Sequence, residues 1–327
     1  MATAQIAAPR IERARFLYAH YDWFVLAACS WLVAGGFLDG WAHGHFGQLD
    51  PFFTPWHGIL YSGYAATAAL IVGRFLLDRS VPAAYRLSLI GCGTFAVGGL
   101  ADMVWHLTFG IERQIANVLS PSHLLLIVST GLVVSGPLRA ALARPGIRAP
   151  FYAVLAGALI LCYLTLITEF AQPYLDRLAA IPARARMPYN EAVQIGLFGV
   201  ILQSAILVIL LLRMRERFEL PFGTLTVMVG LQGLMLGLQT NLDFMVLVAV
   251  LGGLAGDVWL RVLGRRTHVL AFAVPATVYA IYVLSLLLVY GTWWEVHAVT
   301  GIVVVAGLTG WAISMLTNRP QAQPAAA

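Results

Sequence analysis

The sequence predicts an all-α, polytopic membrane protein: a helix bundle of about ten transmembrane helices that contains an internal helical-hairpin repeat. Of its 327 residues, 60% are hydrophobic and only 11% are charged. Soluble domains carry about 25% charged residues, so this composition excludes a water-soluble globule. Apolar stretches of about 20 residues, long enough to cross a bilayer core of about 30 Å, recur along almost the whole chain. A polar pattern between these stretches occurs twice and predicts the repeat.

The apolar stretches delimit the expected elements in order. The run 220–263 is too long for one helix, and we divide it at the polar segment 239–243. The spans are then 23–42, 57–77, 87–108, 120–138, 150–170, 191–212, 220–240, 243–263, 268–290 and 297–316. A cytoplasmic or interfacial N-terminal segment (1–22) precedes a transmembrane domain (23–316), and a disordered tail (317–327) follows it.

The basic residues predict the orientation. All 20 are arginines, and only Arg113, Arg177, Arg184 and Arg186 fall on the side opposite the N-terminus. Because cytoplasmic loops carry the excess of positive charge, both termini are expected in the cytoplasm. The first span is too long for a cleaved signal peptide. The absence of lysine and the many alanines and arginines favour a bacterial inner membrane. Arginines scattered between apolar runs do not form a nucleic-acid surface, so we expect the lipid bilayer as a partner and no nucleic acid.

The histidines sort to the opposite side, where spans begin or end. Six of the eight lie there: His43, His45, His57, His106, His123 and His297. Their spacing contains a repeated unit, Asp-x3-His, then Phe-Gly, then Pro-x-His. The first copy supplies Asp39, His43 and His57, and the second supplies Asp102, His106 and His123.

This unit predicts metal ligands. Residues i and i+4 share one helix face, so each aspartate and the histidine after it can face one ligand, and the next helix adds a second imidazole near its start. One carboxylate with two imidazoles suits Cu, Fe, Mn or Zn and leaves coordination positions open. We predict a metal site in each hairpin, 23–77 and 87–138, or one dinuclear centre if the hairpins pack together. A proton relay or a hydrogen-bond network is the alternative.

Other polar residues on this side are weaker candidates. His45, Asp50 and Glu112 could be ligands, partners of ligands or solvated side chains. A third metal site could use Glu295 and His297. Further acids lie near the later loops, namely Glu169, Glu191 and Asp243. An echo of the Asp102 segment around Asp257 is interpreted as chance.

At the two hairpins the sequence resembles the C subunit of the copper membrane monooxygenases, the particulate methane and ammonia monooxygenase family. That subunit carries Asp-x3-His and, about a dozen residues later, a segment much like Phe-Thr-Pro-Ser-His with a downstream tyrosine. Here the segment runs from Phe53 through His57 to Tyr61. Asp39, His43 and His57 match the first ligand set of the family. Asp102, His106 and His123 are similar to its second set, in which asparagine replaces the aspartate.

The resemblance implies copper as cofactor, and the donor set leaves iron or zinc as alternatives. It also implies activation of dioxygen, hydroxylation of a small apolar substrate arriving through the lipid, and other membrane subunits or a homo-oligomer as partners. The residues leave two other functions open. One is a metal-ion transporter, which requires polar side chains deeper in the membrane. The other is a zinc-dependent lipid hydrolase, in which Glu112 or Asp50 serves as acid or base.

Overall fold

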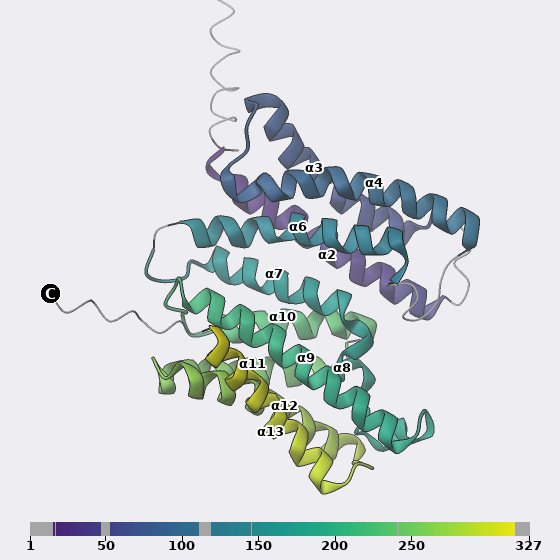
Figure 1. The fold of residues 1–327 in the computed structure, drawn as a ribbon, viewed down its shortest axis with the longest axis vertical. Helices are drawn as coiled ribbons and strands as arrows, with labels where there is room; N and C mark the ends of the chain where they lie inside the picture. Colours follow the sequence, from purple (N-terminus) through teal and green to yellow (C-terminus); the bar gives the residue numbers. More distant parts are fainter. Residues whose placement is uncertain are drawn as a thin grey trace, which may run out of the picture. The chain divides into compact units, whose positions relative to one another are not determined.

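The protein is described here from a computed structural model that covers residues 16, 18–46, 53–110, 119–144, 146–240 and 242–317. Most of the expected cytoplasmic or interfacial N-terminal segment (1–22) and nearly all of the tail lie outside these residues, as do Asp50 and Glu112. The described chain is helical, and its only β-bridges are isolated ones. The all-α prediction is therefore confirmed. The chain divides into two compact units, Met1–Arg144 and Pro145–Ala327, and each is described by itself (Figure 1).

The first unit consists of two helical hairpins. Helices α2 (Tyr21–His45) and α3 (Pro55–Asp78) form the first, and α4 (Arg86–Phe109) and α6 (Pro121–Ala143) form the second. A 3₁₀ turn (Ala83–Tyr85) precedes α4. Each hairpin corresponds to one copy of the repeated sequence unit, so the repeat in the sequence is also a repeat of helices.

Glycines let the two helices of each hairpin approach closely. A Cβ atom at Gly63 would lie 2.6 Å from the backbone nitrogen of Leu32 on the facing helix. In the second hairpin, a Cβ atom at Gly91 would lie 2.8 Å from the carbonyl oxygen of Ser129. Neither contact is tolerable for a larger residue, and such small-residue packing is typical of membrane helices.

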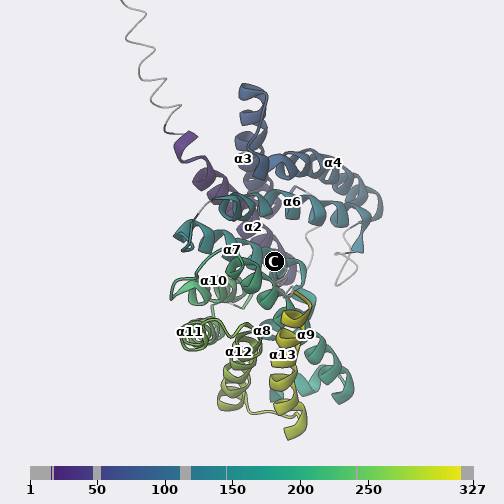
Figure 2. The same cartoon turned by 60° about the vertical axis from the view of Figure 1, so that its left-hand side comes forward.

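The second unit contains six longer helices and short turns between them. They are α7 (Phe151–Ile167), α9 (Tyr189–Arg215), α10 (Thr224–Gln239), α11 (Met245–Leu263), α12 (Thr267–Tyr290) and α13 (Val296–Thr317), with the four-residue α8 (Pro173–Asp176) between α7 and α9. Helix α12 packs against both α11 and α13 (Figure 2). The long apolar run divides where we expected, because α10 ends at Gln239 and α11 begins at Met245.

Asp257 in α11 caps the start of α10. Its Oδ1 accepts the backbone N–H of Leu225 at 2.9 Å, and its Oδ2 accepts the backbone N–H of Thr226 at 2.9 Å and the Thr226 hydroxyl at 2.6 Å. A carboxylate at a helix N-terminus satisfies N–H groups that the helix leaves unpaired. The carboxylate of Asp257 therefore has a structural partner in the fold.

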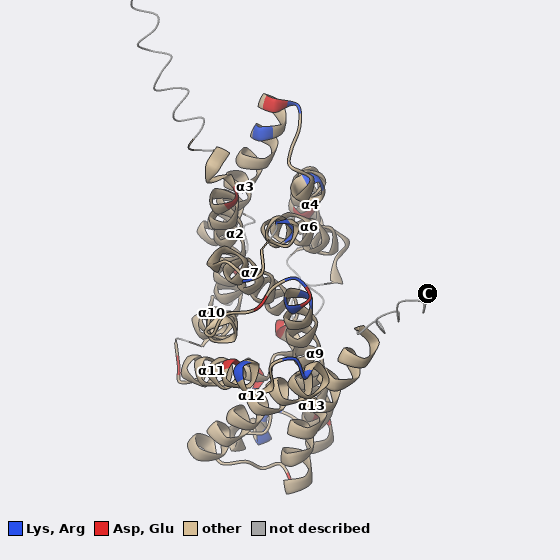
Figure 3. Ribbon diagram, turned by 90° about the vertical axis from the view of Figure 1, so that its left-hand side faces the viewer, with Lys and Arg blue, Asp and Glu red and all other residues tan. Residues whose placement is uncertain are grey.

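Eight of the described helices are long and apolar enough to cross a membrane, and α7 and α10 are shorter apolar helices of 17 and 16 residues. Long stretches of these helices carry no charged side chain (Figure 3). The chain is thus a multi-pass membrane protein.

Candidate metal centres

A helix cap positions the last histidine of each repeat. At the start of α3 the Thr54 hydroxyl accepts the backbone N–H of His57 at 3.1 Å, and at the start of α6 the Ser120 hydroxyl accepts that of His123 at 3.4 Å. A proline occupies the first turn of both helices. Thr and Ser are favoured N-caps, and proline suits the first helical position. The Pro-x-His motif is therefore a helix start that fixes the third residue of the helix.

A close helix–helix contact brings the aspartate of each repeat to this histidine. Gly35 lies one turn before Asp39, and a Cβ atom there would be 2.8 Å from the Cα of Leu60. Gly98 lies one turn before the second aspartate, and a Cβ atom there would be 3.1 Å from Leu126 Cδ2. Both leucines lie three residues after the histidine at the helix start. The two hairpins therefore place a glycine against a leucine at equivalent positions, although Gly35 meets the leucine backbone and Gly98 meets a leucine side chain.

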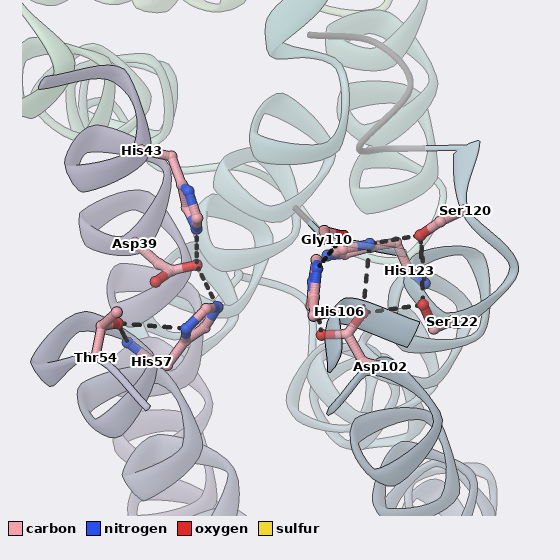
Figure 4. A network of polar contacts seen from close by, with 10 residues as sticks. All are labelled: Asp39, His43, Thr54, His57, Asp102, His106, Gly110, Ser120, Ser122 and His123. Carbon is pink, nitrogen blue, oxygen red and sulfur yellow. Dashed lines mark hydrogen bonds and ion pairs between the residues drawn. The ribbon is translucent and has the colours of Figure 1, made fainter. Parts of the chain in front are cut away.

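Site 1 is formed by Asp39, His43 and His57 (Figure 4). Asp39 Oδ2 lies 3.6 Å from His43 Nε2 and 3.4 Å from His57 Nε2. These separations are long for hydrogen bonds. They match the separation of about 3.4 Å between donor atoms that bind one tetrahedral cation at about 2.1 Å. Asp39 Oδ1 is buried and has no hydrogen-bond partner among the described residues.

Site 2 is formed by Asp102, His106 and His123. Asp102 Oδ2 lies 3.5 Å from His106 Nε2, and Asp102 Oδ1 lies 3.5 Å from His123 Nδ1. Here two serine hydroxyls contact two of these candidate donor atoms. Ser122 donates to Asp102 Oδ1 at 2.9 Å, and the Ser120 hydroxyl lies 2.6 Å from His123 Nδ1. Site 2 is therefore held together by hydrogen bonds within the protein.

In His57 and His106, the ring nitrogen that faces away from the aspartate has a partner that orients the ring. His57 Nδ1 lies 3.3 Å from the Thr54 hydroxyl, and His106 Nδ1 lies 3.3 Å from the carbonyl oxygen of Gly110. In both cases Nε2 is the nitrogen that faces the aspartate. Metal-binding histidines usually have such a second partner, which fixes the ring and its tautomer.

The two sites lie side by side within the first unit (Figure 4). The charges of Asp39 and Asp102 are close enough to interact. Tyr61, one turn after His57, occupies the space that a side chain at position 99 would need, because a Cβ atom on Gly99 would lie 3.3 Å from the Tyr61 oxygen. The six predicted ligands thus form two neighbouring clusters, and in each cluster the three donor atoms lie within 4.8 Å of one another.

The weaker candidates do not join these clusters. The ring of His45 stacks on Trp41, with centroids 4.7 Å apart, and its Nδ1 lies 2.9 Å from the Trp41 carbonyl oxygen. Glu295 Oε2 and His297 Nε2 lie 3.2 Å apart, but both side chains are mostly exposed. Within the described residues no third metal-ligating side chain joins this pair.

Two of the other acids pair inside the second unit. Glu169 accepts a hydrogen bond from Gln239 Nε2 at 3.2 Å, and Asp243 forms an ion pair with Arg177. Neither acid belongs to a described group of three metal-ligating side chains.

Comparison with known proteins finds no matching family model, no similar curated protein and no similar solved structure. The function must therefore be inferred from the residues themselves and from the geometry of the two clusters.

Sequence reasoning did not identify the residues that make the two sites unequal. They occupy the middle position of Pro-x-His, which is Trp56 in the first copy and Ser122 in the second. The doubled glycines before each aspartate, beginning at Gly35 and Gly98, were also visible in the sequence. Their part in the helix contact becomes evident only when the facing helix is in place.

Proposed function

We propose that this membrane protein is a metalloprotein in which site 1 and site 2 each bind a cation at the loop end of a helical hairpin. The observation that carries the proposal is the donor geometry of site 1. A partly buried carboxylate and two imidazole nitrogens converge at separations that suit a shared cation, and one carboxylate oxygen is buried with no hydrogen-bond partner among the described residues. Buried charges in proteins are normally paired or bound to metal.

We further propose copper as the metal, with iron or zinc as the other metals that suit this donor set. The motif likeness to the C subunit of the copper membrane monooxygenases supports copper. Bound copper would supply the redox chemistry with dioxygen that hydroxylates a small apolar molecule. Lateral entry of the substrate from the lipid agrees with the position of both sites in membrane-spanning hairpins.

The protein residues have separate tasks in this proposal. Asp39 supplies negative charge that offsets the charge of the cation. His43 and His57 supply neutral nitrogen donors, and Thr54 holds the His57 ring through Nδ1. In site 2 Ser122 already donates a hydrogen bond to Asp102 Oδ1, which lowers the electron density that this oxygen can offer to a cation. The two sites therefore differ in the cost of binding a metal.

A transport function receives less support from the deeper polar residues. Gln203 donates to the Thr168 hydroxyl at 2.9 Å, and Gln232 donates to the Thr165 hydroxyl at 2.8 Å. Together with the helix-capping Asp257, these side chains have structural partners in the second unit. Zinc-dependent hydrolysis remains the alternative that a metal analysis must distinguish.

We also propose a bacterial inner membrane as the location, with both termini in the cytoplasm. The distribution of arginines supports this orientation. It places both metal sites near the periplasmic face.

Elemental analysis of the purified protein tests the proposal. We expect copper bound by the wild type, with His57→Ala losing the metal of site 1 and His123→Ala that of site 2. His45→Ala is the matched control, because this histidine lies beside site 1 but stacks on Trp41. Unchanged metal content in both ligand variants would exclude the assignment. Tight zinc without oxygen consumption would favour the hydrolase.

A further inference from the structure

The second unit contains a cavity of about 330 Å³ that the metal sites do not explain. It lies where the turn after α8 meets the ends of α10 and α12 and the start of α11. Small-molecule sites usually measure about 300 to 1,000 Å³, so a compact group fits here. The polar lining consists of Asp176, Arg177, Arg186, Thr240, Asp243 and Tyr290.

Arg177 forms a fixed wall of this cavity. Its Nε donates to the carbonyl oxygen of Tyr174 at 3.0 Å, its Nη1 donates to the Tyr290 hydroxyl at 3.3 Å, and its Nη2 pairs with Asp243. Its backbone is in the left-handed region, with φ of 48°. Such a conformation is uncommon for a residue other than glycine and often occurs at binding sites. Asp243 neutralises this guanidinium, so the wall is rigid and carries little net charge.

Arg186 is the cation that remains available. Its side chain is exposed, and its Nη2 donates to the backbone oxygen of Asp176. A guanidinium has five N–H donors, which suit the oxygens of a phosphate or carboxylate. Within the described part of the chain Arg186 makes no other hydrogen bond or ion pair, so donors remain for a ligand.

Asp176 supplies a negative charge beside Arg186. Burial raises the pKa of its carboxyl group to about 6, although the nearby Arg186 lowers it. The group is therefore mainly ionised at neutral pH. Arg186 donates to the backbone oxygen of Asp176 and not to its carboxylate, so this neighbouring cation and anion favour a ligand with charges of both signs. A multiply charged anion would be repelled by the Asp176 carboxylate.

The position of the cavity indicates the source of such a ligand. Two apolar helices, α10 and α12, end beside it at Gln239 and Tyr290, and the ends of such helices are expected near the surface of the hydrocarbon layer. Lipid headgroups occupy this level, and basic pockets between membrane helices bind them. Tyrosine is also enriched at this level.

We propose that this cavity binds a zwitterionic amine-phosphate of the phosphoethanolamine type, with the phosphate on Arg186 and the ammonium group on Asp176. A phosphatidylethanolamine headgroup and a soluble glycerophosphoethanolamine share this chemistry, and the experiment separates them.

The full-length protein in detergent would be titrated with dioleoylphosphatidylethanolamine, with dioleoylphosphatidylglycerol, and with soluble glycerophosphoethanolamine, while the thermal unfolding midpoint is measured. We expect the ethanolamine lipid to raise the unfolding midpoint saturably. The concentration needed should be at least ten-fold below that needed with the glycerol lipid. A rise with the soluble compound at the same concentration would show that the headgroup alone is recognised. A rise with the lipid only would show that the acyl chains contribute. Both results support the site.

Substitutions identify the residues. Arg186→Gln should raise the half-saturating concentration of the ethanolamine lipid at least ten-fold. Arg184→Gln is the matched control, because Arg184 is exposed in the same turn but does not line the cavity. Asp176→Asn should abolish the preference for the ethanolamine lipid over the glycerol lipid. If Arg186→Gln does not fold, the result with Asp176→Asn tests the site. Equal responses to both lipids in the wild type, or equal losses in Arg184→Gln and Arg186→Gln, would overturn the proposal.

Discussion

The two hairpins of the first unit use the same construction but arrive at different sites. In both, a Thr or Ser cap and a proline begin the second helix, and a glycine one turn before the aspartate lets the helices touch. They differ at the residue between proline and histidine. In the second hairpin Ser122 hydrogen-bonds to Asp102, whereas in the first Trp56 stacks on Phe46 with ring centroids 5.8 Å apart.

This difference shows how one side chain can change a site without changing its ligands. Trp56 gives Asp39 no hydrogen bond, so within the described part of the chain the buried Asp39 Oδ1 has no partner. Asp102 Oδ1 already has the Ser122 hydroxyl at 2.9 Å. A hydrogen bond to a charged group contributes about 1.5 to 3 kcal/mol, and here it stabilises the carboxylate in the absence of a metal. We therefore expect site 1 to bind metal more tightly than site 2.

The largest effect is expected from removing the charge of the stronger site. Asp39→Asn keeps the shape of the side chain but removes the anionic ligand, and it should weaken metal binding at site 1 by about 100-fold or more. Asp102→Asn should have a smaller effect at site 2, because the carboxylate there is partly satisfied by Ser122. Metal titration of the two variants by calorimetry measures both losses. Equal losses would contradict the proposed difference between the sites.

Removing the hydrogen bond from Ser122 to Asp102 should strengthen metal binding at site 2. Ser122→Ala removes the hydrogen bond to Asp102 Oδ1 but keeps the cap, which is made by Ser120. Because this bond stabilises the metal-free carboxylate, affinity at site 2 should rise by up to about ten-fold. Competition with a chelator of known affinity would measure the change. A fall in affinity would indicate that the serine positions the carboxylate for metal.

The reciprocal exchange tests the same position in the first hairpin. Trp56→Ser gives site 1 the local sequence of site 2, and a new hydrogen bond to Asp39 should lower metal affinity at site 1 by up to about ten-fold. The variant also loses the stack on Phe46, so its unfolding midpoint must be recorded together with the titration. Unchanged metal affinity in a folded Trp56→Ser variant would show that the residue at this position does not control how tightly site 1 binds metal.

The smallest effect is expected at the cap. Thr54→Val removes the hydroxyl that accepts the His57 backbone N–H and contacts His57 Nδ1. Loss of an N-cap costs about 1 kcal/mol of stability. Loss of a partner behind a ligand weakens metal binding by about ten-fold. Thermal unfolding without metal and metal titration separate the two contributions, and Thr54→Ser should restore both.

Much of the helical framework could be predicted from hydropathy alone. The break at 239–243 and the repeated Asp-x3-His unit were visible without coordinates, because membrane helices reveal themselves through long apolar runs. Helix ends were less certain: the expected span 150–170 ends as an α-helix at Ile167 and continues as a 3₁₀ turn at Glu169–Ala171. The capping role of Asp257 could not be predicted, because its partners at Leu225 and Thr226 lie on another helix.

The sequence by itself determined that the chain crosses a membrane and that Asp39 and His43, like Asp102 and His106, share a helix face, because helical periodicity is local. Only the tertiary structure decided that His57 and His123 reach those aspartates, since this depends on how closely Gly35 and Gly98 let the facing helices approach. It also decided that the two sites are unequal. Whether Ser122 points at a carboxylate depends on the packing of one helix against another, and spacing along a single chain does not specify that distance.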